Sequence, residues 1–142
     1  MDPAFWDSSS LVPICIAQHP ATPIRRLVSR HQVVVWWCTP VEVRSAFARL
    51  VRTGELTAAE HARAQKHLEL LRLSWREIEP TIELRSRAES LLDRFPLKSA
   101  DSLQLAAALA WCGDRAQGRP FISGDKQLLS AASQLGFHPI SA

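Results

Sequence analysis

Cysteine is scarce in this sequence, and the three cysteines present lie far apart, at Cys15, Cys38 and Cys112, without a CxxC pair. An odd number of widely spaced cysteines argues against both a disulfide framework and a structural zinc site. Free thiols in a reducing compartment are the simple interpretation. We therefore expect a cytoplasmic protein.

Two kinds of hydrophobic segment are also missing. The N-terminus lacks a basic region followed by an apolar run, which is the pattern of a secretory signal peptide. No stretch approaches the roughly 20 apolar residues that a membrane-spanning helix needs. We expect no membrane association.

The length of 142 residues suits one domain, and an apolar share of 46% is enough for a core. The sequence thus predicts a single domain over residues 1–142.

Lysine is rare among the cationic residues. It occurs only at Lys66, Lys98 and Lys126, so fourteen of the seventeen Lys and Arg residues are Arg. The guanidinium group binds phosphate and carboxylate through two parallel hydrogen bonds, whereas the ammonium group acts as a point charge. An Arg-rich surface suits a nucleic acid or an acidic protein partner. Genomic base composition gives the same enrichment and stays open as an explanation.

Apolar runs and helical periodicities alternate along the chain. We expect strands near residues 3–6, 32–37, 75–79, 119–123 and 137–140, and helices near residues 11–17, 24–30, 40–53, 58–73, 81–95, 99–111 and 126–135. Thr39 should be the N-cap of the third helix, with Glu42 completing a capping box. Strands that alternate with helices predict an α/β fold with a mainly parallel sheet.

Four of the fourteen acidic residues stand apart from those on polar helix faces. Asp7, Glu42 and Asp125 each follow a predicted strand, and Asp101 lies in the first turn of a strongly apolar helix. Strand-to-helix turns of a parallel sheet share one edge, so these carboxylates should meet there. Taken singly, each acid also has a helix-capping explanation.

Four carboxylates in one small pocket repel one another, and burial adds to the cost of ionisation. A divalent cation relieves that repulsion. Oxygen ligands without histidine or cysteine favour Mg²⁺ or Mn²⁺ over zinc, and the five histidines form no HxH or HExxH pair. The four acids therefore predict a pocket that holds Mg²⁺ or Mn²⁺, with one or two ions.

The segments around these acids resemble the motifs of PIN domains, in order along nearly the whole chain. They are residues 5–12 (FWDSSSLV), 39–43 (TPVEV), 97–106 (LKSADSLQLA), 121–132 (FISGDKQLLSAA) and 136–140 (GFHPI). The resemblance implies a PIN-like three-layer α/β/α sandwich. The size of the chain is similar to that of the VapC-type toxins of toxin–antitoxin pairs.

What the resemblance implies is a Mg²⁺- or Mn²⁺-dependent endoribonuclease that leaves 5′-phosphate and 3′-hydroxyl ends. Asp7, Asp101 and Asp125 would be the principal metal ligands, and Glu42 would complete the shell or help to activate water. Ser9 and Ser123 would orient a ligand or a water molecule. Six Arg residues are candidate RNA contacts, and two of them, Arg44 and Arg49, follow Glu42 on its helix. The six are Arg25, Arg26, Arg30, Arg44, Arg49 and Arg52.

The resemblance also implies partners, namely a cognate VapB-type antitoxin that blocks the pocket and a second copy of the chain. Together, two copies of the chain and their antitoxins would form a heterotetramer or a larger assembly. The helices at residues 24–30 and 42–53 are the expected docking sites. A non-catalytic PIN module that binds RNA or protein is the alternative, although degenerate modules typically lose acids. A haloacid-dehalogenase-type phosphatase is disfavoured, because it needs a second Asp where Ser9 stands.

Overall fold

The computed structural model describes residues 2–16 and 22–142, with side chains described at residues 2–16 and 26–142. Five parallel strands form one sheet in the order β3-β2-β1-β4-β5. The strands are β1 (Asp2–Trp6), β2 (His31–Trp36), β3 (Arg76–Ile78), β4 (Pro120–Ser123) and β5 (His138–Ser141). The helices are α1 (Ser8–Ile16), α2 (Thr22–Arg30), α3 (Thr39–Arg52), α4 (Ala58–Arg72), α5 (Ile82–Arg94), α6 (Ser99–Trp111) and α7 (Lys126–Gln134).

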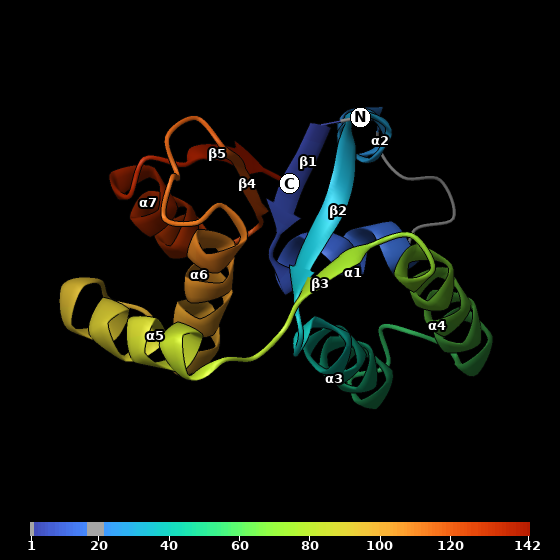
Figure 1. Cartoon of the computed structure of the whole chain (residues 1–142). Helices are drawn as coiled ribbons and strands as arrows, with labels where there is room; N and C mark the ends of the chain where they lie inside the picture. Colours follow the sequence, from blue (N-terminus) through green and yellow to red (C-terminus); the bar gives the residue numbers. More distant parts are fainter. Residues whose placement is uncertain (1, 17–21) are drawn as a thin grey trace.

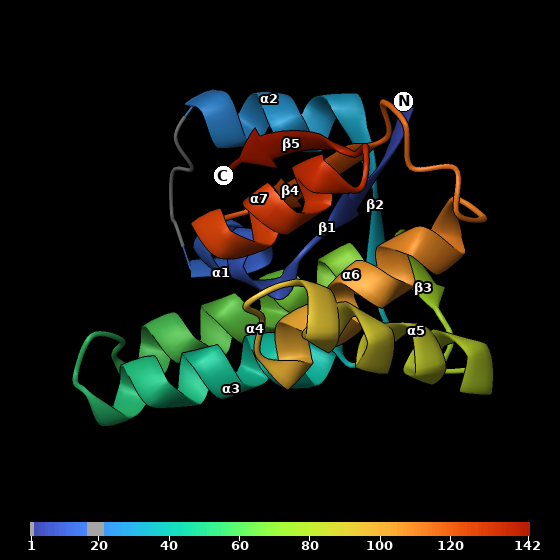
Figure 2. The ribbon, with the colours of Figure 1, turned by 90° about the vertical axis from the view of Figure 1, so that its left-hand side faces the viewer.

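Helices cover both faces of the sheet and make three layers (Figures 1 and 2). Successive residues of a strand point to opposite faces, and β1 shows this clearly. Phe5 packs with α5, α6 and α7, whereas Trp6 packs with α1, α3 and α4. In β2, Val34 and Val35 divide between the same two cores. The continuous apolar run of β2 thus has a simple cause, since both of its faces are buried.

The predicted α/β architecture with a parallel sheet is confirmed, and each predicted strand and helix has a counterpart in the structure. The predicted first helix differs most, because α1 begins at Ser8 rather than at Leu11. Its predicted end at residue 17 lies outside the described residues. The three serines after Asp7, which the sequence analysis left outside the helix, form the first turn of α1.

The predicted capping box of the third helix is wrong. The N-cap of α3 is Cys38, and Thr39 lies inside the helix, fully buried. Pro40 stands in the first turn, as expected of a residue without a backbone N–H to satisfy. The side chain of Glu42 is held elsewhere, by Ser8 and by a residue of α6. Tertiary hydrogen bonds therefore compete successfully with the local cap.

All five strands run the same way, so their carboxyl ends share one edge of the sheet. Trp6 pairs with Ile122, which places the end of β1 beside the end of β4. The turns that follow β1, β2 and β4 therefore open on one region. Within the described part of the chain, no helix is both long and apolar enough to cross a membrane.

Candidate active site

Asp7 occupies the first position after β1, the central strand. Its N–H donates to the Ile122 carbonyl at 2.9 Å, which extends the pairing of β1 with β4. The side chain is only 4% exposed. The hydroxyls of Ser9 and Ser123 donate to Asp7 Oδ2 at 2.5 and 2.8 Å. Burial raises the pKa of the Asp7 carboxyl, although hydrogen bonds from Ser9 and Ser123 oppose the rise.

Asp125 follows β4 and begins α7. Its Oδ1 accepts the backbone N–H groups of Gln127 and Leu128 at 2.8 and 3.2 Å, so its expected capping role is confirmed. Ser123 ties this residue to Asp7, because Ser123 Oγ accepts the Asp125 N–H at 2.9 Å while donating to Asp7. One carboxylate oxygen of Asp125 is thus engaged with its own helix.

Asp101 lies in the first turn of α6 and is half-buried. Burial raises the pKa of its carboxyl, and the negative charges of Asp125 and Asp7 raise it further. Lys98 opposes these effects. Asp101 lines the same cavity as Asp7 and Asp125, so α6 brings it to the edge where β1 and β4 end.

Glu42 projects from the first turn of α3, and both of its oxygens accept hydrogen bonds. Ser8 Oγ donates to Oε2 at 3.1 Å, and Gln104 Nε2 donates to Oε1 at 3.1 Å. Burial is the largest cause that raises the pKa of Glu42, to about 7, and the charges of Asp7 and Asp101 contribute. Glu42 is therefore poised between its charged and neutral forms near neutral pH.

Gln104 is a site residue that the sequence analysis missed. It is fully buried on α6, one turn after Asp101, and its Nε2 also donates to Ser8 Oγ at 2.6 Å. Its Oε1 is buried without a hydrogen-bond partner, which costs about 1–3 kcal/mol. A signal existed in the sequence, because Gln104 is the single long polar side chain in the apolar run from Leu103 to Ala110.

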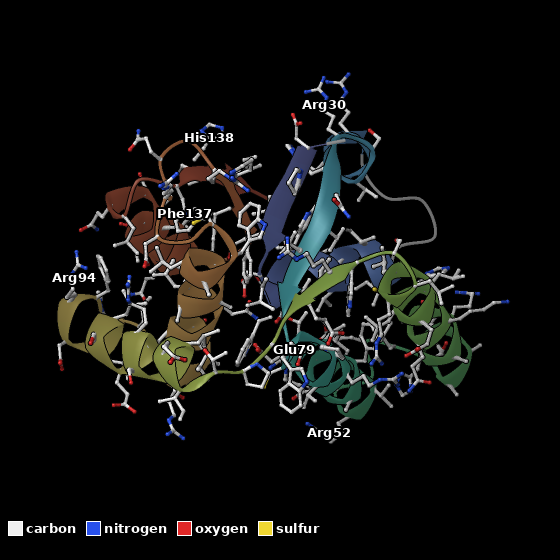
Figure 3. All side chains as sticks on the ribbon, in the orientation of Figure 1. Arg30, Arg52, Glu79, Arg94, Phe137 and His138 are labelled. Carbon is white, nitrogen blue, oxygen red and sulfur yellow. The ribbon has the colours of Figure 1, made fainter. Side chains whose placement is uncertain are left out.

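The arginines singled out from the sequence fall into different places. Arg49 lies on α3 and lines the same cavity as the acids. Arg44, on that helix too, pairs with Glu69 of α4 at 2.7 Å. Figure 3 shows Arg30 beside the start of β2 and Arg52 near the end of α3. Arg26 shares α2 with Arg30, at the opposite end of β2 from the acids. The side chain of Arg25 lies outside the described residues.

The four acids line one cavity of about 180 Å³. None of the three ion pairs among the described residues involves them. Oxygen donors without a cationic partner suit Mg²⁺ or Mn²⁺. In the present side-chain positions, however, no three acidic, His or Cys residues of the described chain are close enough together to hold an ion. The donor chemistry fits a divalent ion, and coordination requires the carboxylates to move closer.

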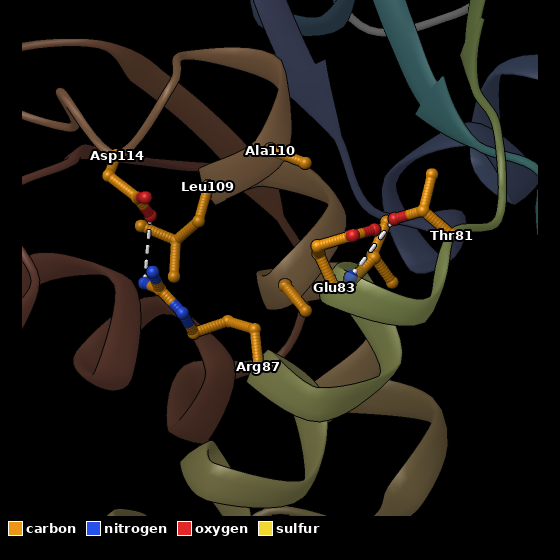
Figure 4. Close-up of a pocket in the computed structure, with 8 residues that line it drawn as sticks. Thr81, Glu83, Arg87, Leu109, Ala110 and Asp114 are labelled. Atoms are coloured by element: carbon orange, nitrogen blue, oxygen red, sulfur yellow. Dashed lines mark hydrogen bonds and ion pairs between the residues drawn. The ribbon is translucent and has the colours of Figure 1, made fainter.

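A second cavity, of about 110 Å³, lies between α5 and α6, away from the acids (Figure 4). Arg87 and Asp114 close one side of it through an ion pair at 2.8 Å. Thr81 lines it as well, and its hydroxyl accepts the Leu84 N–H at 3.0 Å as the cap of α5. Thr81, Arg87 and Asp114 thus serve local structure, and the acid cavity, which is lined by Asp7, Glu42, Asp101 and Asp125, is the better candidate for chemistry.

Comparison with known proteins gave likenesses of structure alone. No protein family matches the sequence, and no similar curated protein was found. The structure of PAE2754 from Pyrobaculum aerophilum superposes with a TM-score of 0.66 over 97% of this chain and 89% of that chain, at 18% identity. FitAcB from Neisseria gonorrhoeae superposes with a TM-score of 0.62 over 96% of each chain, at 15% identity. The fold is PIN-like.

In this PIN-like fold the acid cavity lies at the carboxyl edge of the sheet, where open parallel sheets commonly bind their ligands. The chain order also changes direction here, because β1 is flanked by β2 on one side and by β4 on the other. At such low identity the likeness shows the fold, and the chemistry rests on the residues themselves.

Proposed function

We propose that this chain is a divalent-metal-dependent endoribonuclease and the toxin of a VapBC-type toxin–antitoxin pair, which cuts RNA and so inhibits translation and growth. One observation carries the proposal. Four carboxylates, in the turns after β1 and β4 and in the first turns of α3 and α6, line one cavity of a PIN-like fold, and none of them has an ion-pair partner among the described residues.

Asp7, Asp101 and Asp125 are the proposed ligands of Mg²⁺ or Mn²⁺, and Glu42 either joins them or acts on the attacking water. One or two such ions would supply the charge that activates water and stabilises the leaving oxygen of a phosphodiester. The shared cavity and the oxygen-only donor set support this assignment.

The protein groups around the acids have separate tasks in this proposal. Ser9 and Ser123 fix the Asp7 carboxylate through Oδ2. Glu42, whose carboxylate is held in place by Ser8 and Gln104, is proposed to accept a proton from the attacking water. The resemblance to PIN domains implies 5′-phosphate and 3′-hydroxyl products.

Arg49 is the proposed contact for RNA phosphate, because it lines the cavity and none of the described ion pairs includes it. The proposed protein partners are a VapB-type antitoxin and a second copy of the chain, in a heterotetramer or larger assembly. Antitoxin docking is proposed on α2 and α3, of which α3 lines the cavity with Glu42, Ser45 and Arg49.

A cleavage assay with purified chain free of any partner tests the proposal. We expect cleavage of RNA with Mg²⁺ or Mn²⁺, no cleavage with EDTA, and no cleavage by Asp7→Asn or Asp101→Asn. Asp93→Asn is the matched control, since Asp93 is exposed on α5 and does not line the cavity. Activity that survives EDTA or both substitutions would sink the metal mechanism.

A chain that folds, binds RNA and never cleaves it would favour the non-catalytic module instead. The toxin role has a separate test. Induced expression without an antitoxin should stop growth, and the Asp7→Asn variant should leave growth unaffected. Normal growth on expression of a folded wild-type chain would remove the toxin role and leave the nuclease activity standing.

A further inference from the structure

Gln104 closes a cycle of hydrogen bonds with two residues of the acid cavity. Its Nε2 donates to Ser8 Oγ at 2.6 Å and to Glu42 Oε1 at 3.1 Å. Ser8 Oγ in turn donates to Glu42 Oε2 at 3.1 Å. Because both carboxylate oxygens are held, the plane and direction of the Glu42 carboxylate are fixed. The cycle joins α1, α3 and α6 through three side chains.

The direction of the Gln104 amide follows from its neighbours. An ionised carboxylate only accepts hydrogen bonds, so the amide atom that faces Glu42 has to be the nitrogen. An amide nitrogen has two N–H groups, and the two shorter contacts, to Ser8 and Glu42, account for both. Thr39 Oγ1 lies farther away, at 3.4 Å. The carbonyl oxygen of Gln104 is left buried without a partner.

An unpartnered buried carbonyl is unfavourable for folding. A residue chosen for packing alone would be Leu or Met at this position, since the neighbouring residues of α6 are apolar. The two donated hydrogen bonds explain why an amide is found there. Gln104 is also fully buried, so it cannot itself touch RNA.

From this geometry we infer that Gln104 is a positioning residue that holds the Glu42 carboxylate toward the acid cavity and thereby supports divalent-ion binding. This role rests on the proposed function, because it needs the cavity to bind an ion. Residues that orient a metal-binding group typically change metal affinity or activity by about 10- to 100-fold when replaced.

Gln104→Met tests the inference, because it keeps the length of the side chain and removes both donors. It also removes the unpartnered carbonyl, so the variant should fold with a melting temperature near that of the wild type. We expect isothermal titration with Mn²⁺ to show affinity about 10-fold or more below wild type. In RNA cleavage, kcat should fall while KM stays unchanged. Gln104→Asn is a second variant, which draws the amide back by one methylene.

A double-mutant cycle shows whether Gln104 acts through Glu42. Added to Glu42→Gln, Gln104→Met should weaken Mn²⁺ binding little further, because the carboxylate that it orients is already gone. Ser102→Ala is the matched control, since Ser102 is equally buried on α6 but donates to the Ala88 carbonyl of α5. This control should lose thermal stability and keep the wild-type Mn²⁺ affinity.

Two results would overturn the positioning role while leaving the proposed function intact. One is wild-type Mn²⁺ affinity and cleavage in a folded Gln104→Met variant. The other is a loss of affinity that simply adds to that of Glu42→Gln. A wild-type chain that binds no Mn²⁺ and cleaves no RNA gives a third, distinguishable result, because it overturns the proposed function and the positioning role together.

Discussion

At the scale of single residues, Glu42 shows how position alone changes an ordinary carboxyl group. Burial raises its pKa, Asp7 and Asp101 add repulsion, and hydrogen bonds from Ser8 and Gln104 only partly compensate, so the pKa reaches about 7. The pKa of Glu60 is lowered instead, chiefly because its carboxylate accepts the Thr57 backbone N–H at the start of α4. The contrast marks Glu42 as a group whose charge changes in the physiological range.

The affinity for Mn²⁺ should therefore depend on pH through Glu42. A proton and a cation compete for the carboxylate, so affinity should rise as the pH increases through about 7 and level off above that value. Isothermal titration between pH 5.5 and 8.5 measures this, and Glu42→Gln should remove most of the rise near pH 7. A wild-type affinity that stays constant over this range would contradict the role of Glu42.

The sequence was sufficient to predict which four acids share an edge, because each follows a strand or begins a buried helix. It was not sufficient for the hydrogen bonds that hold them. Gln104 and Ser8 are 96 residues apart in the chain, and no local pattern reports such a contact. The metal roles of Asp7, Asp101 and Asp125 stay predictions.

At the scale of elements, the helices whose ends carry strong local signals were predicted well. Helix α4 begins at Ala58, as predicted, after a capping box of Thr57 and Glu60, and Thr81 caps α5. The N-cap of α3 was predicted wrongly, because Cys38 precedes the helix and Thr39 is buried inside it. Helix boundaries could thus be read from the sequence, whereas a cap whose side chains are engaged in tertiary hydrogen bonds could not.

Helix α3 offers a comparison of two arginines with different surroundings. Arg49 lines the acid cavity, while Arg44 is engaged with Glu69 at 2.7 Å. Arg49→Ala should raise KM for RNA. It should also reduce the slope of the logarithm of the binding constant against the logarithm of the salt concentration by about one phosphate contact, because a guanidinium that binds phosphate releases a counterion. Filter binding over a series of salt concentrations, together with steady-state cleavage, measures both effects.

Arg44→Ala is the matched control on the same helix. Its loss removes an exposed ion pair, worth about 0–1 kcal/mol, and should leave KM and the salt slope near the wild-type values. Equal effects of the two substitutions would show that general positive charge, rather than the position of Arg49, attracts RNA.

At the scale of the whole molecule, repulsion among the carboxylates of the acid cavity lowers the stability of the folded chain. Glu42 has a higher pKa in the folded chain, about 7, than its ordinary value of 4.5, so the folded state binds the proton more tightly. The stabilisation that a protonated Glu42 gives to the fold is fully present below about pH 4.5 and is lost as the pH rises through about 7. The raised pKa values of Asp7 and Asp101 act in the same direction.

Metal-free wild type should therefore lose thermal stability between pH 5 and pH 7.5, relative to Glu42→Gln, which lacks the titrating group. Saturating Mn²⁺ at pH 7.5 should raise the melting temperature of the wild type, since an ion that binds only the folded state stabilises it. Thermal unfolding followed by circular dichroism measures both. The prediction would be contradicted if the wild type gained thermal stability over this pH range relative to Glu42→Gln.

The central place of β1 has a consequence for synthesis on the ribosome. Asp7 emerges early, but Ser123, which donates to it across 116 residues of sequence, and Asp125 emerge late. One edge of β1 has no neighbour until β4 has been made. A growing polypeptide thus has no complete acid cavity during most of its translation. A ribosome that makes the proposed nuclease would have to extend the chain past Asp125 before that chain could act on any RNA, including the message being read.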